Sequence, residues 1–154
     1  DKIVVMHDGK VEQIGTPLEV YDKPNNLFVA GFIGSPAMNM IKGRLDPENP
    51  SSFIAEDGTR LPVQGAPDSA IGKDLIYGLR PEYISLGNDG IPAEISVIEP
   101  TGYETHIVAR FGGCDANCVF RERVNAKPGD VINLQIDTSH IHLFDSASGE
   151  RLTA

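Results

Sequence analysis

The segment from Phe28 to Asn39 reads FVAGFIGSPAMN and divides the chain into two parts of different character. Before it, a hairpin signal is followed by short helical patterns. After it, short β-prone runs alternate with turns that contain Gly or Pro. Within this segment, Gly34 permits a positive φ, and Pro36 restricts its own φ and the conformation of Ser35. The triplet Gly34-Ser35-Pro36 therefore sets the direction in which the chain leaves the first part. The candidate hinge residues are Gly34, Ser35, Pro36 and Asn39.

The boundary predicts two units, residues 1–34 and residues 35–154. In the first, Ile3 to Met6 and the turn signal Asp8-Gly9 indicate a β-hairpin. Thr16-Pro17-Leu18-Glu19 is typical of a capped helix start, and this helix should end before Pro24. Asn25 or Asn26 can cap a second helix that ends at Gly31 or Gly34.

The second unit contains no helix-length amphipathic segment. Turn signals recur about every ten residues, at Asp57-Gly58, Asp89-Gly90, Gly112-Gly113 and Pro128-Gly129-Asp130, which is the pattern of a small barrel or sandwich. We therefore predict a mainly β fold, a β-barrel of the OB type with a short α/β segment before it. The expected strands are Met38 to Leu45, Ser52 to Ala55, Arg60 to Val63, Leu75 to Leu79, Glu94 to Ile98, His106 to Phe111, Cys118 to Arg123 and Val131 to Ile136.

Composition excludes several functions. The 154 residues carry a formal charge of -9, which opposes binding to nucleic acid. No run approaches the roughly eighteen apolar residues that a membrane span needs, and the start of the chain lacks a signal peptide. The sequence begins at Asp1 with a strand-like run already under way, so we expect further residues upstream in the natural protein.

A phosphate-binding loop is absent from the sequence. Such a loop needs leading glycines whose backbone N–H groups approach phosphates, then Lys and Ser or Thr. Gly9-Lys10 is followed by Val11 and Gly72-Lys73 by Asp74, and neither pair has the leading glycine. We therefore expect this chain neither to bind nor to hydrolyse ATP, and we expect no cofactor in it.

Three motifs occur in the order found in one family: FVAGFIGSPAMN at 28–39, YGLRPE at 77–82 and HLFD at 142–145. This order resembles the ATPase subunit of carbohydrate-type ABC importers, the maltose and glycerol-3-phosphate uptake class. The resemblance implies that residues 1–34 end an ATP-binding domain and that residues 35–154 form the appended regulatory domain. It implies an OB or TOBE-type barrel, a homodimer, transmembrane permease subunits and a regulatory protein as partners, and a cytoplasmic location at the membrane. ATP and Mg²⁺ would belong to the full-length parent.

The regulatory or interface candidates are Arg80, Glu82, Glu99, Glu104, His142 and Asp145. Arg80 could form a forked pair with a carboxylate such as Glu82 or Glu99, or it could contact a partner chain. Glu99 to Thr105 should form a sharp, solvated corner between two strands. Its two carboxylates, Glu99 and Glu104, could alternatively act as the acid and base that hydrolyse a glycosidic bond. In the HLFD motif, Asp145 should begin a turn.

Two ligand-binding alternatives remain open from the residues. His140 and His142 would share one face of a strand and could join Cys114, Cys118 and His106 in a zinc site, but no second compact ligand pair follows the cysteines. Related barrels in oxyanion importers bind molybdate. Ser35, Met38 and Asn39 resemble that motif loosely, with Met38 where an Arg is expected. Equilibrium dialysis with molybdate would separate this alternative from the regulatory one.

Overall fold

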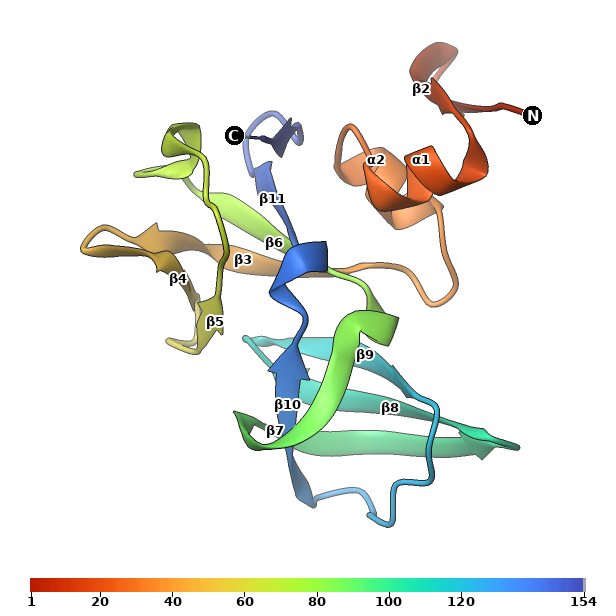
Figure 1. The fold of residues 1–154 in the computed structure, drawn as a ribbon, viewed down its shortest axis with the longest axis vertical. Helices are drawn as coiled ribbons and strands as arrows, with labels where there is room; N and C mark the ends of the chain where they lie inside the picture. Colours follow the sequence, from red (N-terminus) through yellow and green to blue (C-terminus); the bar gives the residue numbers. More distant parts are fainter. Residues whose placement is uncertain (154) are drawn as a thin grey trace.

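The computed structural model describes residues 1–153, which form a short α/β unit followed by two antiparallel β-sheets (Figure 1). The α/β unit lies to one side of the sheets, and a single connection leads from it into the first long strand (Figure 1). Within the described residues, no helix is long and apolar enough to cross a membrane.

The α/β unit begins with a hairpin of β1 (Ile3–His7) and β2 (Lys10–Gly15). Its turn residues Asp8 and Gly9 have φ values of 51° and 78°, the positive values that a tight two-residue turn requires. Two short helices follow, α1 (Pro17–Asp22) and α2 (Leu27–Phe32). The hairpin and both helices were predicted from the sequence, and all three are confirmed.

Both helices begin at the predicted caps. The Thr16 hydroxyl accepts from the Glu19 N–H at 3.2 Å, and the Glu19 carboxylate accepts from the Thr16 N–H, which completes a capping box. The Asn26 side chain accepts from the Val29 N–H at 3.0 Å at the start of α2. Polar side chains thus satisfy N–H groups that a helix start leaves without partners.

The hairpin is apolar on both faces. Its inner face contributes Val5 to a small core with Val20 and Val29. On its outer face the cross-strand pairs are Val4 with Ile14 and Met6 with Val11, and each of these four side chains is more than half exposed. This outer face, defined by Val4, Met6, Val11 and Ile14, is called the hairpin face below.

Helix α2 also carries an exposed apolar side chain, because Phe32 is 63% exposed. Phe28 is only half-buried, because its ring stacks on His7 at 4.0 Å and on Phe32 at 5.8 Å.

The larger sheet has six strands in the order β12-β11-β6-β3-β4-β5. Its strands are β3 (Asn39–Asp46), β4 (Asn49–Ala55), β5 (Arg60–Pro62), β6 (Leu75–Leu79), β11 (His142–Asp145) and β12 (Arg151–Leu152). Strand β6 is buried along its whole length. At Gly43, β3 passes from pairing with β6 to pairing with β4.

The smaller sheet has the order β10-β7-β8-β9. Its strands are β7 (Ile84–Thr101), β8 (Glu104–Phe111), β9 (Cys114–Phe120) and β10 (Val131–Ile136). Single turns of 3₁₀ helix lie at η1 (Asp68–Ala70), η2 (Pro81–Tyr83) and η3 (Thr138–His140), between strands of the two sheets or within their connections.

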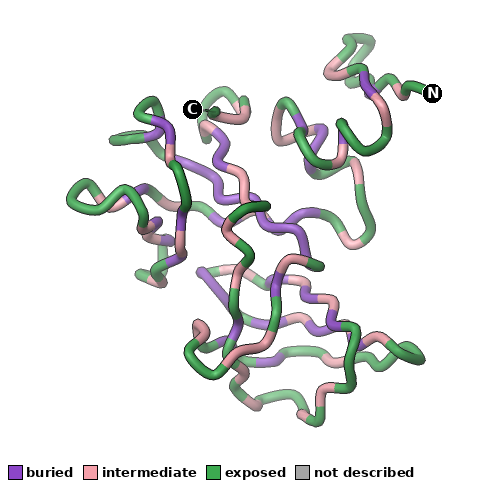
Figure 2. The backbone as a smooth tube through the Cα atoms, viewed as in Figure 1, coloured by how far each residue is buried: buried purple, intermediate pink, exposed green. Residues whose placement is uncertain are grey.

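One hydrophobic core joins the two sheets. Phe53, Tyr77 and Leu79 from the larger sheet belong to the same buried cluster as Ile107 and Leu134 from the smaller one. Buried backbone is concentrated in the central strands, and the turns are exposed (Figure 2). The predicted mainly β fold with a short α/β segment before it is therefore confirmed.

The predicted bounds of strand β9 were wrong. The sequence predicted a strand from Cys118 to Arg123, but β9 begins at Cys114, directly after the Gly112-Gly113 turn. In β9 buried and less buried residues alternate, and the buried ones are Ala116, Cys118 and Phe120. The polar residues Asp115 and Asn117 between them made the segment look like a loop. The signal was present, because a period of two is that of a strand with one buried face.

The turn predicted at Asp89-Gly90 does not reverse the chain. Residues 84–86 and 92–94 of β7 both pair with β10, and residues 87–91 form a bulge between them. Gly90 lies so close to β10 that a Cβ there would be 2.6 Å from the Leu134 carbonyl oxygen. Glycine is therefore needed here because the backbones of β7 and β10 approach closely. The sequence Asp89-Gly90 looks like a turn because glycine is favoured in both situations.

Candidate functional site at the Arg80 joint

Arg80 is a charged residue buried where the α/β unit meets the barrel. It directly follows β6, and its exposed fraction is 1%. The apolar strand before it runs into the core, and Pro81 then begins η2, so the sequence places the guanidinium inside the protein.

The Arg80 guanidinium binds the carboxyl-terminal ends of both helices. Nη1 donates to the carbonyl oxygens of Ala30 at 3.1 Å and Ile33 at 2.6 Å, and Nη2 donates to that of Tyr21 at 3.0 Å. Helix ends leave carbonyls without partners and carry partial negative charge, so a buried cation is favourable there. We call these contacts the Arg80 joint.

The predicted carboxylate partner of Arg80 was wrong. Glu82 accepts a hydrogen bond from the Tyr21 hydroxyl, and the Arg80 guanidinium lies 4.0 Å from the centre of the Tyr21 ring. Glu99 lies on β7, opposite His106 of β8. Backbone carbonyls at the ends of the two helices accept from Arg80 in place of a carboxylate. They lie 47 to 59 residues away in the sequence, so the sequence did not indicate this pairing.

Burial dominates the electrostatics of the joint. It lowers the pKa of Arg80, against the influence of Tyr21 and Glu82. Burial likewise raises the pKa of Tyr21, and the hydrogen bond to Glu82 adds to the rise. The tyrosine is therefore a stable donor to Glu82 at neutral pH, which ties η2 to α1 through a second contact.

Gly34 packs directly against this joint. Its φ is 108°, and a Cβ would stand 3.1 Å from Arg80 Nη1 and 3.3 Å from the Tyr21 ring. Glycine is required by the backbone conformation and by the lack of space. The next peptide bond, Ser35-Pro36, is cis, and Ser35 is exposed. A hinge role for this triplet stays a prediction.

Asn39 connects the two sheets. Its amide donates to the Asn117 carbonyl oxygen at 2.9 Å, and its Oδ1 accepts from the Asn117 N–H at 2.8 Å. The partner of Asn39 is thus the backbone of the edge strand β9. Met38 is buried against Ala30, Ile76 and Phe144. Two of the three side chains of the molybdate alternative are thus engaged within the protein.

Glu99 and Glu104 lie away from the joint, on the β7–β8 hairpin. The Glu104 carboxylate lies 3.2 Å from His106 Nε2, and Gly102 turns the corner with a φ of 67°. The corner is exposed, and Tyr103 at its tip is 81% exposed. Within the described residues this corner has the form of a solvated turn with an outward aromatic side chain.

His142 and Asp145 occupy the two ends of β11. Burial first, and then the charges of Arg151, Arg80 and His140, lower the pKa of His142 to about 4. Asp145 accepts from the Ala147 N–H at 2.9 Å, which lowers the pKa of its carboxyl, and it pairs with Lys73 at 3.5 Å. Asp145 does begin a turn, as predicted.

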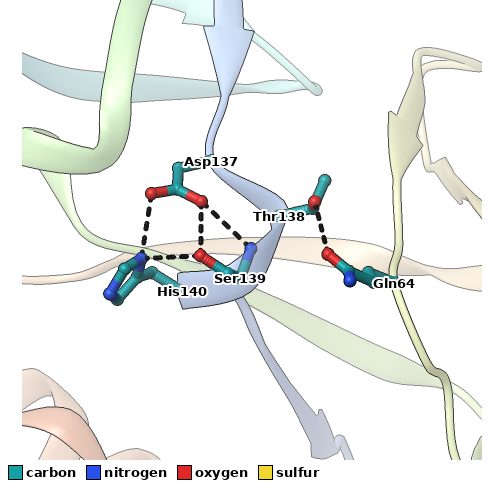
Figure 3. Close-up of polar contacts among 5 residues, drawn as sticks. All are labelled: Gln64, Asp137, Thr138, Ser139 and His140. Atoms are coloured by element: carbon teal, nitrogen blue, oxygen red, sulfur yellow. Dashed lines mark hydrogen bonds and ion pairs between the residues drawn. The ribbon is translucent and has the colours of Figure 1, made fainter.

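A Ser, His and Asp cluster on η3 was not recognised in the sequence (Figure 3). Asp137 Oδ2 lies 2.9 Å from His140 Nδ1, and Ser139 Oγ lies 3.1 Å from the same nitrogen. Hydrolytic triads use the two different ring nitrogens for these contacts. Asp137 Oδ1 also accepts from the Ser139 N–H and hydroxyl, so the cluster is a capped turn and no proton relay.

The residues of the zinc alternative are dispersed. His140 lies on η3 and only His142 on a strand, so the prediction that they share a strand face was wrong. Cys118 is buried in the core, and burial raises the pKa of Cys114. In the described part of the chain, no three His, Cys, Asp or Glu side chains are grouped as metal ligands would be.

The neutral state of His142 predicts a pH dependence of stability. The folded pKa of about 4 lies below the ordinary value of 6.5, so the unfolded chain takes up the proton first as pH falls. The free energy of unfolding should decrease from pH 6.5 towards pH 4, by at most about 1.4 kcal/mol per pH unit. In urea unfolding series, His142→Gln should flatten this slope; an unchanged slope would contradict the assignment.

Comparison with known proteins agrees with this architecture. The chain matches the MalK OB fold domain over residues 34–84 and the TOBE domain over residues 77–144. A solved structure of the cytoplasmic molybdate-binding protein ModG, with molybdate bound, matches 68% of this chain and 94% of its own length. Its TM-score is 0.54 and its identity 16%, so this likeness concerns the fold alone.

Curated relatives match nearly the whole chain. An uncharacterized ABC transporter ATP-binding protein of Sinorhizobium fredii, y4oS, is 47% identical over 152 residues, 99% of this chain and 41% of that protein. The sn-glycerol-3-phosphate import ATP-binding protein UgpC 2 of Agrobacterium fabrum is 38% identical over 157 residues, with coverages of 99% and 41%. UgpC of Escherichia coli is 37% identical over 156 residues, with coverages of 98% and 43%.

The fold and these matches agree that the chain contains a MalK-type OB fold domain followed by a TOBE domain. The chain is homologous to a carboxyl-terminal part of ABC transporter ATP-binding proteins. It spans less than half the length of the relatives named here.

Proposed function

We propose that this chain is the regulatory and dimerisation region of an importer ATPase subunit that serves sugar, polyol or glycerol-3-phosphate uptake. The observation that carries this proposal is the match of the chain, over 98 to 99% of its length, to glycerol-3-phosphate import ATP-binding proteins. The region itself would be non-catalytic. The parent subunit would bind ATP and Mg²⁺, work with transmembrane permease subunits and lie at the inner face of the membrane.

We further propose that residues 1–34 are the last part of an ATP-binding domain and residues 35–154 the regulatory barrel. The α/β unit has its own small core of Val5, Val20 and Val29, separate from the barrel core. The hairpin face leaves four large apolar side chains exposed, and such a face calls for a covering partner. The remainder of an ATP-binding domain would cover it in the parent subunit.

The mechanism would be mechanical. The Arg80 joint attaches both helices of the α/β unit to the start of η2, so a displacement of the ATP-binding part would move the barrel with it. Contacts between two barrels would hold two subunits together during the transport cycle. A regulatory protein that prefers one arrangement would shift the cycle by its difference in affinity.

Self-association of the chain tests this proposal. We expect a dimer by light scattering, either between barrels or through the hairpin face, whose strands have free edges. Val4→Glu with Ile14→Lys places opposite charges on a cross-strand pair and removes the apolar character of the hairpin face. A barrel-to-barrel dimer should survive these changes, and a hairpin dimer should dissociate.

The matched control places the same charges in the smaller sheet. Val97 and Val108 are also a cross-strand pair, so Val97→Glu with Val108→Lys should weaken only a dimer that uses the outer surface of β7 and β8. If the unsubstituted chain and both variants are monomers at high concentration, the dimerisation proposal fails.

A further inference from the structure

The loop between α1 and α2 is fixed to the strand that precedes α1. The Gln13 side chain on β2 donates to the Lys23 carbonyl oxygen at 3.0 Å and accepts from the Asn25 N–H at 2.8 Å. The Glu12 carboxylate, also on β2, accepts from the Asn26 side-chain amide at 2.6 Å. The loop is therefore expected to move with the hairpin, as part of the α/β unit.

The other side of this loop is bound to the β11–β12 turn and to β12 (Figure 1). The Leu27 N–H donates to the Gly149 carbonyl oxygen at 2.8 Å. The Arg151 N–H donates to the Asn25 carbonyl oxygen at 2.9 Å, and the two bonds enclose one antiparallel β-bridge. The Arg151 side chain adds a third bond, from Nε to the Pro24 carbonyl oxygen at 2.8 Å. We call these three hydrogen bonds the β12 latch.

Arg151 binds the α/β unit in the same manner as Arg80. Each guanidinium belongs to the barrel and donates to a backbone carbonyl near the end of α1, Pro24 for Arg151 and Tyr21 for Arg80. Carbonyls at helix ends carry partial negative charge, which favours a cationic donor. Arg151 is half-buried, so its side chain is held between the two units and is not a freely moving surface group.

The β12 latch and the Arg80 joint hold opposite ends of α2. The latch binds Leu27, the first residue of the helix, and Arg80 binds the carbonyls of Ala30 and Ile33 at the other end. At a rise of about 1.5 Å per residue, the six residues of α2 place the two attachments about 9 Å apart. Between them, Ala30 belongs to a buried apolar cluster with Ile76 of the larger sheet.

Two separated attachments restrict motion in a way that one cannot. A single attachment at Arg80 would let the α/β unit turn on the barrel. A second attachment at the far end of α2 leaves only rotation about the helix axis, and the apolar cluster beneath the helix opposes that rotation.

We propose that the β12 latch makes the α/β unit and the barrel move as one body, with Arg151 as its positioning residue and α2 as the element that carries motion between the two units. Without the latch, the Arg80 joint would act as a pivot. The rigid attachment is a property of this chain alone. Its use in a transport cycle rests on the proposed function.

Residual dipolar couplings of backbone N–H groups test this proposal, because they report whether two parts of a chain share one orientation. In the unsubstituted chain, the couplings of β1, β2 and α1 should fit the same alignment tensor as those of the two sheets. In Arg151→Met, the α/β unit should require a tensor of smaller amplitude. Amide exchange at Leu27 should become about tenfold faster, the effect of losing one hydrogen bond from a charged donor.

A second variant and a matched control accompany Arg151→Met. Leu27→Pro removes an N–H donor of the latch at the first helical position, where proline is tolerated, and it should also reduce the tensor amplitude. Arg60→Met breaks a pair with Asp46 on the opposite edge strand of the larger sheet, and the two units should keep one tensor.

Two results would overturn the proposal. In the first, the α/β unit keeps the full tensor amplitude in both Arg151→Met and Leu27→Pro, so that the Arg80 joint alone fixes the orientation. In the second, the unsubstituted chain already requires two tensors, so that the latch is open in solution. The couplings measure orientation within one chain, and their outcome is separate from the self-association that tests the proposed function.

Discussion

Arg80→Met is expected to lower the free energy of unfolding by about 3 kcal/mol, because three helix-end carbonyls would lose their donor inside the protein. Met fills a similar volume, so the change tests the hydrogen bonds more than the packing. Urea unfolding followed by circular dichroism measures the loss. Hydrogen exchange should show that the last turns of α1 and α2 open more often than β8 does.

Two control variants define the expected range for Arg80. Arg110→Met breaks an exposed pair with Asp115 and should cost less than about 1 kcal/mol. Arg80→Lys keeps the charge but loses the planar fork, so it should fall between the two Met variants. A loss below 1 kcal/mol for Arg80→Met would mean that the joint does not hold the helices to the barrel.

Gly43→Ala is expected to be comparably destabilising, by about 3 kcal/mol, through overpacking. A Cβ at Gly43 would stand 2.2 Å from the Ile54 carbonyl oxygen and 2.7 Å from the Phe53 ring. The oxygen is backbone in a paired strand, so it cannot move without breaking the β3–β4 ladder. The thermal midpoint and the urea midpoint should both fall.

Gly31→Ala is the matched control, because the same methyl group would meet nothing within 4 Å there. Gly31 lies within α2 and is exposed, so alanine should stabilise the helix by roughly 0.5–1 kcal/mol. Equal effects of the two substitutions would contradict the close approach of β3 and β4.

Much of the local structure could be predicted from the sequence. The Asp8-Gly9 turn, the Thr16 capping box and the Asn26 cap are determined by residues within four positions of each other, and all three formed as expected. The boundary proposed at Gly34-Ser35-Pro36 rests on the same kind of local signal and stays a prediction. The motif order from Phe28 to Asp145 identified the family, because three separate motifs in one order are more specific than any single one.

The candidate site could not be predicted to the same extent. Arg80 was recognised as a site residue, but its binding to the ends of α1 and α2 depends on how the α/β unit sits against β6. The Asn39 bonds to Asn117 cross 78 positions and exist only because the two sheets share a core. Asp89-Gly90 has the signature of a turn, and its use as a bulge is decided by the packing of β10.

By itself, the sequence determined the elements, their caps, the mainly β class and the family, because hydrophobic period, turn chemistry and capping act over a few residues. The tertiary structure alone decided the partners of Arg80 and Asn39 and the half-buried position of His142, and it brought Ser139 and His140 beside the joint. Those contacts depend on burial and on backbone groups distant in the chain. Every residue offers the same backbone carbonyl, so no pattern of side chains marks which one a buried guanidinium will find.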